Sequence, residues 1–193
     1  WLIALFNFIH VGFESGMGGW LKTYTGRVEP EASSILFPPI LLYFFFFVAG
    51  RAAAPIFLRV LDENKLLMAN LLVMLAGTSI LLFAENLLLL SVGAVVAGFG
   101  TSSIFPTNVS RFANTFGATA TRRATPLFLC GTLGAAVTTW IIGFASNYFG
   151  DLRSGMFILL GASVTLAVLQ MFLMLGRGRR SGGGNGGSRT EKL

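Results

Sequence analysis

Three polar side chains in the first apolar stretch of the chain have types and spacing that could support chemistry. Asn7, His10 and Glu14 lie within the segment WLIALFNFIHVGFESGMGGWL, three and four residues apart. In a helix this spacing places all three on one face. A carboxylate at membrane depth costs at least ~2.5 kcal/mol on insertion scales, so it normally faces a cavity or a partner. The pattern favours a proton-handling site, and a His–Glu pair that only fixes helix packing is the alternative.

The segment that follows Glu14 is rich in glycine: Gly16, Gly18 and Gly19 come just before Trp20. Each glycine weakens a helix by up to ~1 kcal/mol relative to alanine. We therefore expect a discontinuous helix here, as transporters often have beside a binding site. Trp20 could stack on a sugar ring or anchor the helix at the membrane interface.

A second polar set lies in the segment GFGTSSIFPTN, which starts at Gly98. Its glycines are expected to loosen the helix, and Pro106 is expected to kink it because proline has no N–H. The hydroxyl and amide groups suit a neutral, polyhydroxylated solute better than an ion, although such groups also hold membrane helices together. They are Thr101, Ser102, Ser103, Thr107 and Asn108. Thr139 and Trp140, in the next apolar stretch, could reach the same cavity.

The composition indicates whether the protein lies in water or in a membrane. Hydrophobic residues make up 54% of the chain and charged residues 11%, with a mean hydropathy of +0.74. A soluble domain has about 25% charged residues, so this chain lacks the means to cover its surface in water. Hydropathy predicts an all-α, polytopic membrane domain over residues 1–176 with six spans. The spans cover about 1–21, 34–60, 64–84, 87–111, 125–147 and 154–175.

The basic residues predict the orientation of this domain. Most of the 14 Lys and Arg fall in connections on one side of the predicted membrane, and only Lys22, Arg27 and Arg153 fall on the other. By the positive-inside rule the first side, which includes the C-terminus, is cytoplasmic. The net charge of +6 is therefore a topological signal, and nucleic acid is not an expected partner. The Gly/Ser-rich segment 177–193 is predicted to be a disordered cytoplasmic tail.

Several other classes of protein are disfavoured. His10 is the one histidine and Cys130 the one cysteine, which leaves no metal site, no disulfide framework and no convincing intramembrane protease. We expect neither an enzyme nor a cofactor. The alternative kept open is a self-contained six-span protein that dimerises into a carrier or channel. The start at Trp1, inside an apolar stretch, favours instead a fragment of a longer protein.

Three segments resemble the C-terminal, six-helix half of the major facilitator superfamily. VGFESGMGGWLKTY is similar to the start of that half in the fucose–proton symporter and glucose transporter family. GRAAAPIFLRVLDENKL resembles the basic loop between spans eight and nine, and GFGTSSIFPTNVSRFANTFG resembles span ten and its cytoplasmic exit. The resemblance implies that spans seven and ten line a central cavity, and that an N-terminal six-helix half is missing.

The resemblance also implies a mechanism. Two six-helix halves would rock about a midplane site that takes a small polar solute, a sugar in the favoured case, with a proton or sodium ion. Arg51 and Arg59 would form a cytoplasmic gate, with Asp62 and Glu63 as local partners. The chain would then lie in the bilayer of a plasma membrane or a bacterial inner membrane. Since coupling carboxylates of the superfamily often lie in the first half, Glu14 need not act alone.

Overall fold

The computed structural model describes residues 1–182, in which all regular structure is helical. The long helices are α1 (Leu2–Val28), α2 (Pro39–Phe57), α3 (Glu63–Phe83), α4 (Leu87–Thr101), α5 (Ile104–Phe116), α6 (Ala120–Phe149) and α7 (Leu152–Gly182). Two short 3-10 helices, η1 (Pro30–Ser33) and η2 (Gly117–Thr119), lie in connections. The all-α class predicted from the sequence is confirmed for this range.

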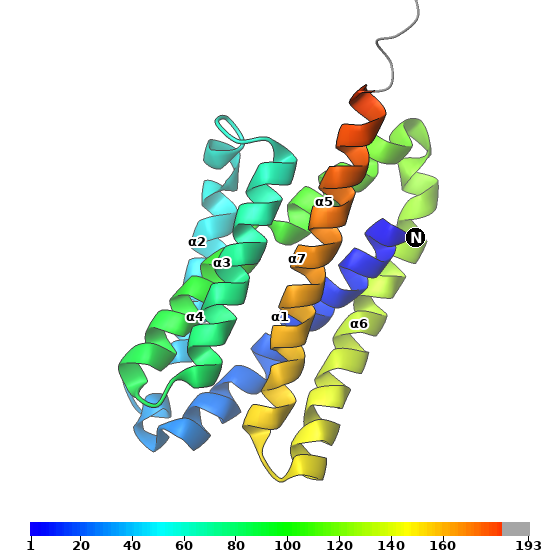
Figure 1. The fold of residues 1–193 in the computed structure, drawn as a ribbon. Helices are drawn as coiled ribbons and strands as arrows, with labels where there is room; N and C mark the ends of the chain where they lie inside the picture. Colours follow the sequence, from blue (N-terminus) through cyan, green and yellow to red (C-terminus); the bar gives the residue numbers. More distant parts are fainter. Residues whose placement is uncertain (183–193) are drawn as a thin grey trace, which may run out of the picture.

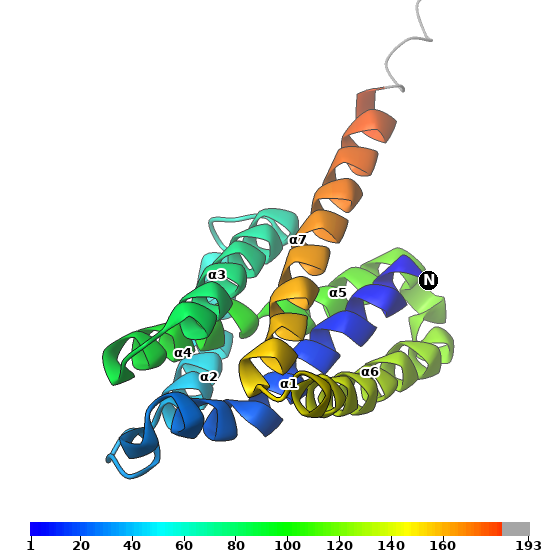
Figure 2. The same ribbon diagram turned by 60° about the horizontal axis from the view of Figure 1, so that its bottom comes forward.

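The helices pack as two groups. α2, α3 and α4 contact one another through α4, while α1, α6 and α7 contact one another directly. Figures 1 and 2 show these groups side by side, with α3 and α7 in contact between them. α5 contacts α1, α3 and α6. α5 therefore contacts helices of both groups, and the segment that links it to α4 lies where the groups meet.

Close backbone contacts, rather than helix breaks, explain several glycines. A Cβ added to Gly98 would overlap the Tyr43 carbonyl of α2, and one added to Gly134 would overlap the Phe8 carbonyl of α1. α4 nevertheless remains helical up to Thr101. The glycines therefore do not interrupt α4 themselves, and the space they leave is filled by neighbouring backbones.

α1 is also continuous through its glycine-rich segment. A Cβ on Gly16 would lie 2.8 Å from Ile142 Cδ1 and 2.9 Å from Leu159 Cδ2, so α6 and α7 pack closely there. The packing of α1 against two helices outweighs the weak intrinsic propensity of glycine. The predicted discontinuity after Glu14 is therefore not present.

The fourth predicted span is instead the broken one. α4 ends at Thr101 and α5 begins at Ile104, with Ser102 and Ser103 between them. The break lies just before Pro106, whose ring interferes with the preceding helical turn and whose nitrogen cannot donate a hydrogen bond. The kink expected from Pro106 is thus a complete interruption of two residues.

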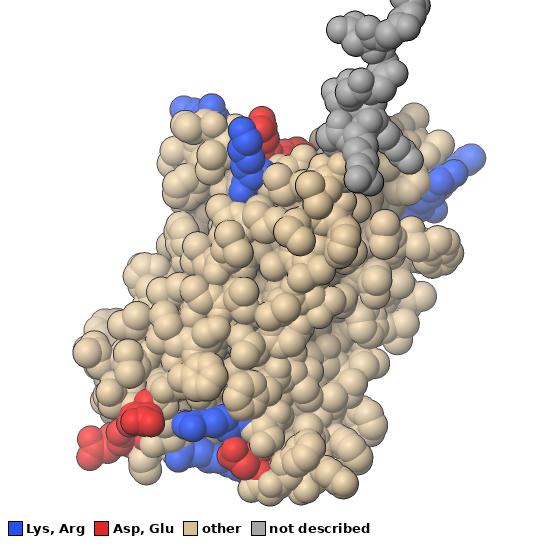
Figure 3. Space-filling model, in the orientation of Figure 1, with Lys and Arg blue, Asp and Glu red and all other residues tan. Residues whose placement is uncertain are grey.

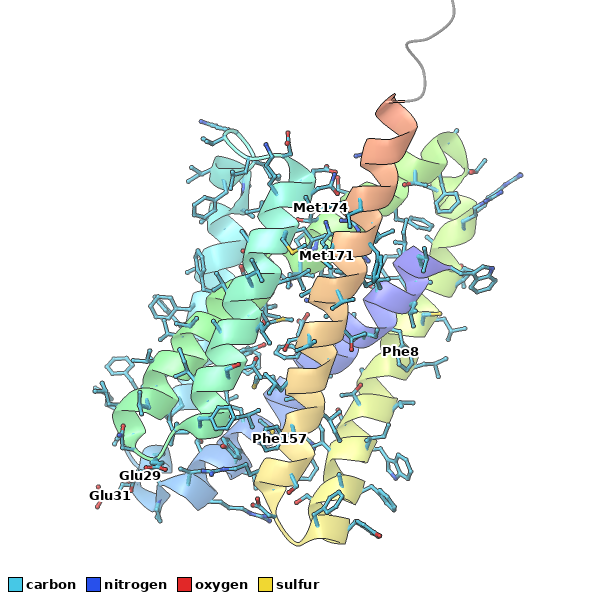
Figure 4. The ribbon with its side chains drawn as sticks, viewed as in Figure 1. Phe8, Glu29, Glu31, Phe157, Met171 and Met174 are labelled. Atoms are coloured by element: carbon cyan, nitrogen blue, oxygen red, sulfur yellow. The ribbon has the colours of Figure 1, made fainter. Side chains whose placement is uncertain are left out.

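The surface fits a membrane environment. On the face shown in Figure 3, the Lys, Arg, Asp and Glu side chains lie at the two ends of the molecule, with a broad uncharged belt between them. Glu29 and Glu31 mark one of these ends in Figure 4. Large apolar side chains are exposed on the surface, for example Phe45 and Leu88. In water such exposed area would be costly, whereas lipid tails accommodate it.

Four helical segments in the described range are long and apolar enough to cross a membrane. They are Pro39–Phe57, Glu63–Phe83, Leu87–Phe149, which contains α4, α5 and α6, and Leu152–Leu175. α1 is not among them, because its polar residues and glycines lower its hydropathy. The count of six spans and the orientation therefore remain predictions. Most of the predicted tail, residues 183–193, lies outside the described range.

Candidate functional site

The break between α4 and α5 exposes a backbone carbonyl that α2 supplies with a donor. In an unbroken helix the Ser102 carbonyl would accept from the N–H of residue 106, but that residue is Pro106. Arg51 Nε donates to this carbonyl instead, at 3.0 Å. The Arg51 guanidinium lies 4.3 Å from the centre of the Phe47 ring, one turn back on α2. Arg51 thus caps the broken span from a neighbouring helix.

Other side chains complete the polar groups of the break. Ser102 Oγ donates to the Phe99 carbonyl at 2.6 Å, and a Cβ on Gly50 would overlap the Ser102 side chain. The Asn70 amide of α3 donates to Ser103 Oγ. α2 and α3 therefore both hold the break in place, and Gly50 permits the close approach that Arg51 needs.

His10 faces this break from α1. Its side chain is 1% exposed and lies beside the Thr101 backbone, yet neither imidazole nitrogen has a hydrogen-bond partner among the residues that the structure describes. The Tyr43 hydroxyl of α2 also lies near Thr101, is fully buried and has no partner in the same range. Two buried polar groups from different helices thus converge on Thr101 at the end of α4 without forming a hydrogen bond of ordinary geometry.

Glu14 lies one turn further along α1 and is half-buried. Arg51 is close enough to act electrostatically on His10, Glu14 and Tyr43. Arg51 and Glu14 form no ion pair, and the ion pair found within residues 1–182 joins Lys65 to Asp62 at the molecular end. The polar residues gathered around the break between α4 and α5 are called the break cluster. They are His10, Glu14, Tyr43, Arg51, Thr101 and Ser102.

The two asparagines of the predicted site lie outside the break cluster. Asn7 Nδ2 donates to the Leu127 carbonyl of α6 at 3.0 Å, in space that Gly131 leaves open. Asn108 Nδ2 donates to the Ile3 carbonyl of α1 at 3.4 Å. Both amides tie helices together, although each side-chain oxygen has no partner in the described range.

The predicted aromatic site residues also lie elsewhere. Trp20 Nε1 donates to the Thr139 carbonyl of α6 at 3.1 Å, and its ring packs against Gly143. Trp140 is 67% exposed and stacks on Phe144 with 5.5 Å between ring centres. The Thr138 side chain lies against Gly12 of α1. Trp140, two positions further along α6, therefore faces away from α1. Trp20 and Thr139 fasten α1 to α6, and Trp140 belongs to the outer surface.

The two arginines of the predicted gate differ in their surroundings. Both are exposed, but Arg59 lies in the turn after α2, whereas Arg51 lies within α2 and reaches the break between α4 and α5. The acids expected to pair with them have other partners: Asp62 pairs with Lys65, and Glu63 Oε1 accepts from Ser110 Oγ at 2.9 Å. In the conformation described, the acceptor of Arg51 is a backbone carbonyl.

Tyr43 is the member of the break cluster that the sequence analysis missed. The available signal was a single hydroxyl in the apolar run LLYFFFF, which gives no indication of its neighbour. The comparisons with known proteins add no assignment, since the chain matches no protein-family model and none of the curated proteins compared with it.

Proposed function

We propose that the chain is one six-helix half of a secondary active transporter that moves a small polar solute by alternating access. A neutral sugar is the favoured class of solute, with a proton or sodium ion as the coupling ion. The observation that carries the proposal is the break cluster, which gathers an acid, a guanidinium, an imidazole and hydroxyls between helices whose outer surfaces are apolar.

The unused hydrogen-bonding groups of the cluster support a binding role. A buried polar group without a well-formed hydrogen bond costs up to about 1–3 kcal/mol, so His10 and Tyr43 together form a costly arrangement for a site that only packs helices. Such groups are satisfied when water or the hydroxyls of a solute enter. Thr101 and Ser102 add hydroxyl oxygens that can accept. An uncharged, polyhydroxylated molecule matches this inventory, because donors and acceptors are mixed and close together.

The charged members suit coupling and gating. Glu14 lies on the same face of α1 as His10 and within the field of Arg51, so its charge state acts directly on the guanidinium. The coupling ion would neutralise Glu14 and thereby weaken its attraction for Arg51. Arg51 would then favour the Ser102 carbonyl, and loss of the ion would favour the carboxylate. Such a choice between two acceptors is a bistable contact of the kind that switching elements require.

The broken span offers a way to transmit this change. α4 packs in one helix group, α5 contacts both groups, and only Ser102 and Ser103 join the two helices. A rearrangement at Ser102 can therefore shift one group against the other without bending either helix. Discontinuous helices beside a midplane site are a recurring device in transporters. The substrate site would be completed by the missing six-helix half.

The direct test is uptake into proteoliposomes that contain the protein expressed from its complete reading frame. Radiolabelled hexoses would be offered under an inward proton gradient, a sodium gradient or neither. We expect gradient-driven uptake for the parent, and loss of gradient-driven uptake but retention of solute exchange for Glu14→Gln. Glu31→Gln, at the end of the bundle, is the matched control. Equal uptake by both variants would rule out coupling at Glu14.

The same reading frame separates the proposal from its alternative. An open frame before the Trp1 codon that encodes six further apolar segments supports the two-half transporter. A start codon and ribosome-binding site directly before Trp1 would favour the dimerising carrier or channel. In that case the break cluster would have to be completed by a second copy of the chain.

A further inference from the structure

A pocket of about 640 Å³ lies away from the break cluster, between the start of α1, the end of α5 and the start of α6. Leu173 of α7 contributes to its wall. The volume falls in the ~300–1,000 Å³ range of small-molecule sites. In Figure 1 this region lies beside the label N, where α1 begins.

The lining of the pocket combines apolar and cationic side chains. Its apolar residues include Leu2, Ile3, Pro126 and Leu127. Its polar residues are Arg111, Arg123 and Thr115. An apolar lining that also carries cationic groups fits an amphipathic anion, because the chain of such a molecule needs apolar walls and its head needs positive charge.

The two arginines are held in different ways. Arg111 is 4% exposed and donates through Nη2 to Gln170 Oε1 at 2.7 Å and to Asn64 Oδ1 at 3.4 Å. Arg123 is exposed, and its guanidinium lies 5.0 Å from the centre of the Phe116 ring. Arg111 is thus a fixed part of the wall, whereas Arg123 is placed at the rim by an aromatic ring and remains open to a ligand.

The position of Arg123 raises the local positive potential. It lies in the first turn of α6, together with Arg122. The N-terminal end of a helix carries partial positive charge, so acidic residues are usually preferred there. Two arginines at this end leave a region whose charge an anion would compensate. The adjoining apolar lining supplies the contact for an attached hydrocarbon chain.

We propose that this pocket binds an anionic phospholipid of the surrounding membrane, with its phosphate at Arg123 and an acyl chain along Leu2, Ile3 and Leu127. The start of α6, which carries Arg123, lies at one end of the molecule in Figure 1, where headgroups are expected. The site is separate from the break cluster. Lipid binding at this pocket is therefore independent of the proposed transport function.

Native mass spectrometry of the full chain, released from nanodiscs of mixed phosphatidylglycerol and phosphatidylcholine, tests the proposal. We expect the retained lipid to be mostly phosphatidylglycerol. Arg123→Gln should lower its apparent affinity about fivefold, since one basic residue at a membrane surface contributes roughly that factor. Arg122→Gln is the matched control, because Arg122 is the next residue and does not line the pocket.

A second pair of variants tests the apolar part. Ala4→Phe places a ring in the pocket and should reduce lipid retention, whereas Ala136→Phe, on an exposed part of α6, should not. Equal losses for Arg122→Gln and Arg123→Gln would overturn the proposal in favour of general surface attraction. Displacement of the lipid by millimolar inorganic phosphate, or an unchanged retention in Ala4→Phe, would also overturn it, because the acyl chain would then contribute nothing.

Discussion

Replacing Arg51 by alanine should destabilise the protein through one identifiable carbonyl. The substitution removes the donor to Ser102 and leaves a buried break without its cap. Hydrogen bonds to charged groups contribute about 1.5–3 kcal/mol. Because the Arg51 side chain is partly in solvent, the lower end applies. We therefore expect a loss of about 1.5 kcal/mol in the free energy of unfolding.

Pro106 makes this expectation testable, because the cap is needed only where proline removes the N–H. Pro106→Ala restores a donor four residues after Ser102, in the position that closes a helical turn. In that background Arg51→Ala should cost about 0.5 kcal/mol or less, as at an ordinary surface position. The interaction energy of the double-mutant cycle should then be about 1 kcal/mol.

Reversible unfolding in mixed micelles of sodium dodecyl sulfate and dodecyl maltoside, followed by circular dichroism, would measure the four free energies. Arg59→Ala is the control, since Arg59 lies in an exposed turn, and we expect a change within 0.5 kcal/mol. Additive effects of Arg51→Ala and Pro106→Ala would refute the capping argument. In uptake assays Arg51→Ala should also slow turnover while leaving solute affinity nearly unchanged, because the cap affects the movement of the break.

Three further predictions concern the break cluster and its supports. Glu14→Gln should flatten the pH dependence of uptake, since a neutral amide cannot take up a proton, and a pH profile identical to that of the parent would make Glu14 structural. Tyr43→Phe should leave the free energy of unfolding unchanged or raise it by up to ~1 kcal/mol. Solute exchange measurements should show a weaker affinity for the solute, and an affinity equal to that of the parent would exclude the hydroxyl from the site. Gly98→Ala should destabilise the protein by about 1–3 kcal/mol through overpacking against Tyr43. Gly26→Ala, where a Cβ would enter open space, should instead stabilise the helix by up to ~1 kcal/mol. Changes of melting temperature with the same sign for both variants would contradict the packing argument.

Much of the helical layout could be read from the sequence. Apolar stretches of about 20 residues are long enough to cross a bilayer, and their positions depend on local composition alone. The predicted segments therefore correspond to helices, and Pro106 indicated where one of them would be interrupted. The structural effect of the glycines was predicted less well. Propensity suggested weak points at Gly16 and Gly98, but close packing of other helices decided both.

The candidate site was only partly predictable. The spacing of His10 and Glu14 places them on one helical face, and this local rule holds in the structure. Asn7 satisfies the same spacing, yet it turns to α6 because Gly131 opens a space there. Trp20 and Trp140 were both candidates for the site, and only the packing of α6 shows that Trp20 joins two helices while Trp140 is exposed.

The sequence by itself determined the apolar, membrane-like surface, the helical class and the gathering of most charges at the two ends. Each of these properties depends on side chains that are near one another along the chain. The tertiary structure alone decided which groups meet at the break. Arg51 and Ser102 are 51 residues apart, and no periodicity links a side chain to a carbonyl at such separation. That contact exists because Gly50 and Gly98 bring α2 against α4, and because Pro106 leaves the Ser102 carbonyl without its helical donor.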